Sequence, residues 1–89
     1  MYTKISFIAH ITVEEKEVLI KFGSKVREIR LKKGLSQEDL AFRADLHRTY
    51  IGMIERAEKN LTLTNICKIC DALEIPLEEI FKFNFDGKK

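Results

Sequence analysis

The sequence lacks several features that would place it in a special class of protein. Its 89 residues include no tryptophan, one proline and four glycines, which argues against collagen-like and low-complexity chains. No apolar stretch approaches about 18 residues, so we expect no transmembrane span. The first residues lack the basic start, long apolar run and cleavage site of a signal peptide. With only two cysteines, these absences predict a cytoplasmic protein with reduced thiols.

Charge is present but unevenly distributed. The formal net charge of +2 is too small to predict nucleic-acid binding by itself. Residues 21–33, however, contain six bases and one acid, whereas residues 71–79 contain four acids and no base. The basic segment 21–33 would then face an anion, and the acidic segment 71–79 would face away from it. Two ordinary solvated helix faces are the alternative interpretation.

The N-terminal segment has the least regular pattern. Residues 2–11 are rich in β-branched and aromatic types with partial period-two alternation, which allows a strand. Such a strand would pair with the strand-like segment 81–85, or the residues would pack as an irregular arm. We therefore divide the chain into an N-terminal arm (1–12), a helical domain (13–85) and a C-terminal tail (86–89).

Apolar residues at helical spacing predict an all-α domain of five helices after the arm. The helix starts are marked by residues that cap a first turn or suit its geometry. These residues are Thr12, which forms a capping box with Glu15, and then Ser36, His47, Thr62 and Pro76. Gly34 suits the end of the first helix because glycine adopts the left-handed conformation readily. The third helix is expected from about Arg48 to Glu58.

The second and third predicted helices have a form that suits duplex DNA. From Ser36 to Ile51 the sequence predicts two short helices joined by a tight turn, the second starting with polar residues. The major groove is about 12 Å wide and admits one α-helix, which the preceding helix braces across the backbone. The segment therefore predicts a helix-turn-helix.

The residues of this segment resemble the Xre-type family of phage repressors and Cro proteins. The resemblance covers roughly residues 24–76 and rests on Val26, Arg30, Gly34-Leu35-Ser36-Gln37, Leu40-Ala41, Ile51 and Ile54-Glu55. It implies a lambda-repressor-like five-helix fold. Within the family, residues 48–50, 54–56 and 60–62 are most similar to the controller proteins of restriction–modification systems. That similarity implies an autoregulatory transcription factor acting as a homodimer on a pseudo-palindromic operator.

Side-chain chemistry and this resemblance together give the candidate DNA contacts. Arg48 can offer two parallel donors to guanine, Thr49 a hydroxyl and a methyl group, and Tyr50 a hydroxyl at the end of a long ring. Candidate backbone contacts, which add affinity without reading sequence, are Gln37, Arg43, His47, Arg56, Lys59 and Asn60. For Tyr50 the alternative is a partly buried ring that makes a hydrogen bond at the surface.

Two further sets of residues have expected structural roles. The resemblance pairs Arg30 with Glu55 as a partly buried salt bridge that links the first helix to the third. The C-terminal apolar residues are the expected dimer interface, because a domain this small has little reason to expose them. They are Ile75, Leu77, Ile80, Phe81 and Phe83. The alternative is that the N-terminal arm covers them within one chain.

Other chemistry has weak support in the sequence. Cys67 and Cys70 have a CxxC spacing, but structural zinc needs two more ligands, and the two histidines are scattered. We therefore expect no metal and treat these cysteines as small apolar residues of a helix. No nucleophile–base pair, carboxylate pair or phosphate-cradling glycine loop stands out, so we expect neither enzymatic activity nor a cofactor.

The expected partners follow from the proposed DNA surface. They are double-stranded operator DNA, a second copy of the chain and, if the protein activates transcription, RNA polymerase; no membrane is expected. A phage-type repressor or the antitoxin of a toxin–antitoxin pair would use the same DNA surface. A protein–protein adaptor would use the helical domain without DNA.

Overall fold

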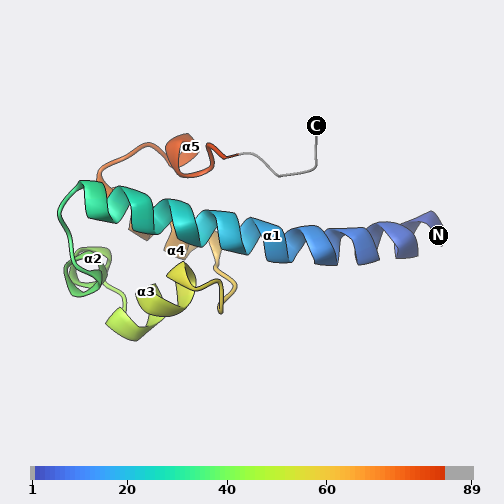
Figure 1. Cartoon of the computed structure of the whole chain (residues 1–89), viewed down its shortest axis with the longest axis horizontal. Helices are drawn as coiled ribbons and strands as arrows, with labels where there is room; N and C mark the ends of the chain where they lie inside the picture. Colours follow the sequence, from blue (N-terminus) through green and yellow to red (C-terminus); the bar gives the residue numbers. More distant parts are fainter. Residues whose placement is uncertain (1, 84–89) are drawn as a thin grey trace.

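The computed structural model describes residues 2–83, with side chains described from residue 16 onward. Over this range the chain forms five helices and no strand, which confirms the predicted all-α class. The helices are α1 (Tyr2–Lys32), α2 (Gln37–Ala44), α3 (Arg48–Glu55), α4 (Leu63–Leu73) and α5 (Leu77–Ile80). α3 and α5 pack against α1, while α2 packs against α3 and α4. In Figure 1, α5 lies on one side of the C-terminal half of α1, and α2 and α3 lie on the opposite side. None of the described helices is long and apolar enough to cross a membrane.

The N-terminal segment differs from the prediction. α1 is continuous from Tyr2, so residues 2–12 form no strand and Thr12 does not begin a helix. Extending a helix adds one hydrogen bond for each residue fixed and needs no new nucleus. A short apolar run such as this fits both the strand and the helix period, and the sequence alone did not choose between them. The tail at 86–89 lies outside the described residues.

The predicted helix boundaries in the middle of the chain are largely confirmed. Gly34 ends α1 with a φ of 72°, and the N–H of Leu35 donates to the carbonyl oxygen of Arg30 over 3.0 Å. Ser36 caps α2 through a reciprocal capping box with Asp39, which the sequence analysis did not identify. His47 and Pro76 are the N-caps of α3 and α5.

One helix end was predicted wrongly. α3 ends at Glu55, three residues before the expected Glu58. Beyond it Ala57 has a φ of 61°, a left-handed conformation that stops the helix. Because alanine is the best helix former and rarely adopts this conformation, no local signal marks the end. The turn is closed by two backbone hydrogen bonds, from the N–H of Ala57 to the carbonyl oxygen of Ile54 over 3.0 Å and from the N–H of Glu58 to that of Met53 over 2.8 Å.

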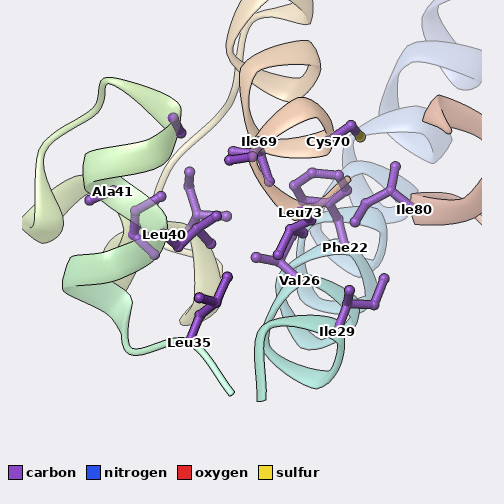
Figure 2. Close-up of a cluster of buried hydrophobic side chains, with 14 residues drawn as sticks. Phe22, Val26, Ile29, Leu35, Leu40, Ala41, Ile69, Cys70, Leu73 and Ile80 are labelled. Atoms are coloured by element: carbon purple, nitrogen blue, oxygen red, sulfur yellow. The ribbon is translucent and has the colours of Figure 1, made fainter. Parts of the chain in front are cut away.

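A single core joins the five helices (Figure 2). Phe22 and Val26 of α1 lie beside Leu73 of α4 in this core, to which Ile29 and Ile69 also belong. Ile80 of α5 is 0% exposed in this core, so its predicted place in a dimer interface is wrong. The apolar pattern predicts that Ile80 is covered, but it does not show whether the core or a second chain covers it.

Close packing also fixes the position of α3 against α1. Gly23 of α1 is buried, and a Cβ atom there would clash with the carbonyl oxygen of Ile54. Only glycine allows the two backbones to approach so closely. α3 is therefore held rigidly on the surface of α1.

Candidate nucleic-acid interface

α3 turns its apolar side inward and its first turn outward. Ile51 and Ile54 are at most 1% exposed, which fixes the rotation of the helix about its axis. Arg48 and Thr49 consequently project from the surface, and both are exposed. The exposed His47 precedes them as the N-cap. A polar first turn thus stands on a rigid frame, the arrangement that groove binding requires.

Tyr50 is held differently from its two neighbours. Its ring is half-buried and packs against the core. Its Oη accepts a hydrogen bond from Nδ2 of Asn65 over 3.0 Å, which ties α3 to the first turn of α4. This geometry matches the partly buried alternative, although the hydroxyl retains its proton as a donor. A role for Asn65 was not expected from the sequence, because the two residues are 15 positions apart.

A buried network connects the ends of three helices. Nε and Nη2 of Arg30 donate to the two carboxylate oxygens of Glu55 over 2.7 and 3.1 Å, so the expected ion pair is present. Nη1 of Arg30 donates to the carbonyl oxygen of Leu35 over 2.8 Å. Glu55 also accepts from Nε2 of Gln37 over 3.0 Å. The network fixes the start of α2 relative to α1 and the end of α3.

This network changes the expected roles of two residues. Arg30 is 6% exposed and neutralised by Glu55, so this member of the basic cluster at 21–33 is removed from the protein surface. Gln37 is half-buried with its amide group oriented by Glu55 rather than free in solvent. Sequence spacing could not predict this bond, because it joins residues that are 18 positions apart.

The remaining backbone candidates surround α3. Arg43 of α2 and the loop residues Lys59 and Asn60 are all exposed. Arg56, the C-cap of α3, is also exposed, and its Nε and Nη2 donate to the carboxylate of Glu58, each over 3.1 Å. These hydrogen bonds raise the pKa of Arg56 and lower the pKa of Glu58. Glu58 thus orients the guanidinium group of Arg56 and partly neutralises its charge.

A hollow opens on the surface between the start of α2 and the outer side of α3. It is lined by Gln37, Arg48, Thr49, Gly52 and Arg56. The lining therefore contains two guanidinium groups and no carboxylate. Four of the five residues were predicted DNA contacts, and the structure brings them together. Gly52 was missed, because a glycine inside a helix carries no functional group that sequence reasoning could recognise.

The CxxC cysteines do not form a ligand set within the described structure. Cys67 is exposed and Cys70 is buried on α4, and both are free thiols. Burial, with a smaller contribution from neighbouring Cys67, raises the pKa of the Cys70 thiol. No cluster of three or more potential metal ligands occurs in the described part of the chain.

Comparison with protein families identifies this arrangement. The family model described as helix-turn-helix matches residues 26–80, more than half of the chain. The chain belongs to the Xre-type helix-turn-helix family. This confirms the resemblance that the sequence motifs indicated.

Curated relatives of this helix-turn-helix protein include restriction–modification controllers. It is 49% identical over 71 residues to the control protein C.BamHI of Bacillus amyloliquefaciens, covering 79% of this chain and 88% of that protein. It is 42% identical over 66 residues to the control protein C.MunI of a Mycoplasma species, covering 73% and 89%. The similarity to controllers within the family is thereby confirmed.

Solved structures of controller proteins have the same fold. That of the restriction–modification controller C.AhdI from Aeromonas hydrophila has a TM-score of 0.70 and 51% identity, covering 71% of this chain and 96% of that chain. A tetramer of the controller C.Esp1396I in complex with its natural 35-base-pair operator matches with a TM-score of 0.69 and 42% identity. That match covers 73% of this chain and 86% of the controller chain.

The helix-turn-helix protein has a second exposed surface, which is apolar. Leu77 and Phe81 are 40% and 41% exposed, whereas Ile75 and Phe83 are half-buried. The ring of Phe81 packs against Phe22 of α1 with centroids 5.7 Å apart. α1 therefore covers part of the C-terminal apolar set within one chain, but Leu77 and Phe81 still face outward.

Proposed function

We propose that the protein is a cytoplasmic transcription regulator that binds operator DNA through α3 and controls a restriction–modification system and its own gene. The observation that carries this proposal is the exposed Arg48–Thr49 turn on a helix fixed by a buried core. In a major groove, this turn would meet base edges, while α2 would lie across the backbone. The identity to two control proteins supports the biological role.

The proposed functional form is a homodimer. Leu77 and Phe81 are large apolar side chains with about two fifths of their surface exposed, and contact with a second copy would cover them. Ile75 and Phe83 would form the margin of that interface. Two α3 helices spaced about one turn of DNA apart, roughly 34–36 Å, would then read the halves of a pseudo-palindromic operator. Sedimentation that shows only monomer at micromolar concentration would reject this form.

Footprinting on the DNA immediately upstream of the gene tests the proposal. We expect a protected site with two related half-sites. Arg48→Ala should weaken operator binding by about ten- to a hundredfold, because a bidentate base contact contributes about 1–3 kcal/mol of discrimination. Arg27→Ala is the matched control, since it removes an arginine of α1 that is also exposed. Equal binding by Arg48→Ala and Arg27→Ala would contradict the proposed recognition surface.

The other candidate functions give different results in the same assay. An adaptor would produce no footprint, and its partner binding would survive the loss of Arg48. A phage-type repressor or an antitoxin would produce a footprint but would lie beside prophage or toxin genes rather than methyltransferase and endonuclease genes. If the footprint adjoins a promoter that the protein activates, RNA polymerase becomes the further partner.

A further inference from the structure

We propose that the hollow floored by Gly52 seats one backbone phosphate of the operator, and that the missing side chain at Gly52 makes this contact possible. The inference rests on the proposed DNA-binding function and assigns a role to a residue that carries no functional group. It also assigns Arg56, at the end of α3, to a phosphate contact and leaves base recognition to the turn at Arg48.

The floor is defined by the absence of a side chain. A Cβ atom on Gly52 would lie 3.2 Å from Nη1 of Arg56 and 3.6 Å from Oε1 of Gln37. The first distance is tighter than ordinary packing, so any side chain would displace the guanidinium group. A larger one would fill the space between the arginine and the glutamine. Glycine in a helix is unfavourable by about 1 kcal/mol relative to alanine, so the position carries a stability cost that a contact would explain.

The guanidinium group of Arg56 is held in a defined orientation. Nε and Nη2 both donate to the carboxylate of Glu58, and Nη1 lies over Gly52. Glu58 thus occupies one edge of the guanidinium group, where its carboxylate competes with an anion, and leaves Nη1 at the hollow.

The other wall shows which groups would hold the anion. Because Nε2 of Gln37 donates to Glu55, the amide oxygen of Gln37 lies nearest the floor. The cationic donors are thus the two arginines, with the Thr49 hydroxyl beside them and one remaining N–H of the amide. A phosphate group with its single negative charge fits this lining, which contains two guanidinium groups. The carboxylate of Glu58, which is not part of the lining, offsets part of the charge on Arg56.

The position of the hollow favours a phosphate over a base. It lies between the first residue of α2 and the side of α3, with Arg48 and Thr49 of the first turn at one margin and Gly52 and Arg56 further along the helix. In helix-turn-helix complexes the preceding helix crosses the backbone, so this flank of α3 faces a strand. The contact would therefore contribute salt-dependent affinity and little sequence discrimination.

Gly52→Ala and Gly52→Leu test the proposal, with Ser24→Ala on the exposed surface of α1 as the control. Gly52→Ala should fold about as stably as the parent protein, because alanine is the better helix former and the arginine above it needs to move by only a few tenths of an ångström. Because Gly52 is buried, the denaturation midpoint of Gly52→Leu is measured beside its operator affinity. Operator affinity should fall with side-chain size, by about tenfold for leucine, as expected for one lost charge-assisted contact. Binding by both variants within twofold of the parent would overturn the inference.

Two measurements distinguish a phosphate from a base. Loss of one phosphate contact should reduce the slope of log K against log salt by about 0.9 and leave the operator-to-random affinity ratio unchanged. A neutral methylphosphonate at one linkage per half-site should weaken the parent protein but not Gly52→Leu. A fall in the affinity ratio with an unchanged slope would overturn the phosphate assignment. If the parent protein itself leaves no footprint, the proposed DNA-binding function fails. If the parent binds the operator and the Gly52 variants bind equally well, only the role of Gly52 fails.

Discussion

The two sides of α3 each hold an arginine–glutamate pair, and comparing them shows how burial decides what such a pair does. On the inner side, the side chains of Arg30 and Glu55 are 7% and 3% exposed. On the outer side, those of Arg56 and Glu58 are 58% and 51% exposed. The side-chain chemistry is the same, and both pairs use Nε and Nη2 of the arginine.

The difference in burial gives the pairs different functions. Water can replace either partner of the outer pair, so that pair contributes little to stability and remains free to exchange its carboxylate for a phosphate. Water cannot replace a partner of the inner pair, because the pair is buried. Loss of one partner would leave the other charge unpaired in a medium of low dielectric constant. The inner pair therefore fixes the frame of α1, α2 and α3, and the outer pair orients one exposed side chain.

The largest expected effect comes from breaking the inner pair. Glu55→Ala should lower the free energy of unfolding by about 3–5 kcal/mol, since it leaves the Arg30 guanidinium group buried and uncompensated. Urea denaturation followed by circular dichroism measures the change. In a domain this small the variant could unfold entirely, so the double variant Arg30→Met/Glu55→Leu is also needed. It should recover most of the stability, because it removes both charges at once. Equal losses in the single and double variants would contradict this account.

Breaking the outer pair should change DNA binding rather than folding. Glu58→Gln removes the competing carboxylate, so affinity for random-sequence duplex at low salt should rise about threefold through one added phosphate attraction. Fluorescence anisotropy at low and high salt measures this change, and the denaturation midpoint should stay within error. Asp71→Asn on α4 makes the same change in net charge at another exposed site. An equal gain from Asp71→Asn would show that net charge, not the pair, is responsible.

The smallest effect concerns the cap of α2, where an exposed carboxylate is stabilised by local hydrogen bonds. The backbone N–H of Ser36, and then its hydroxyl, lower the pKa of Asp39 in the folded protein. A lowered folded-state pKa means that the stabilisation is complete above the unfolded pKa of about 4 and is lost as pH falls through the folded value. Asp39→Asn should therefore reduce the dependence of unfolding midpoint on pH below about 4. Glu38→Gln, in the same first turn, is the control and should leave that dependence in place.

Elements marked by residues close together in the sequence were predicted well. The starts of α2 and α4 depend on Ser36 and Thr62, whose side chains accept hydrogen bonds from the N–H groups of Asp39 and Asn65. The end of α1 depends on a glycine with positive φ. Each signal acts within about one helical turn, which is why composition and spacing revealed it.

Features that depend on distant residues were predicted less well. The burial of Ile80 follows from packing that brings the helices together. The hydrogen bonds from Gln37 to Glu55 and from Asn65 to Tyr50 join residues 18 and 15 positions apart. No local pattern distinguishes these side chains from solvated ones.

The sequence by itself determined the helical class, most of the caps, the helix-turn-helix and the polar first turn of α3, because each depends on periodicity or on neighbours within a turn. Only the tertiary structure decided which arginine is buried and which is exposed, and which apolar residues belong to the core. It also decided that Gly52 floors a hollow between α2 and α3. A hollow is defined by side chains from separate helices, and burial is a property of the packed chain rather than of any residue in it.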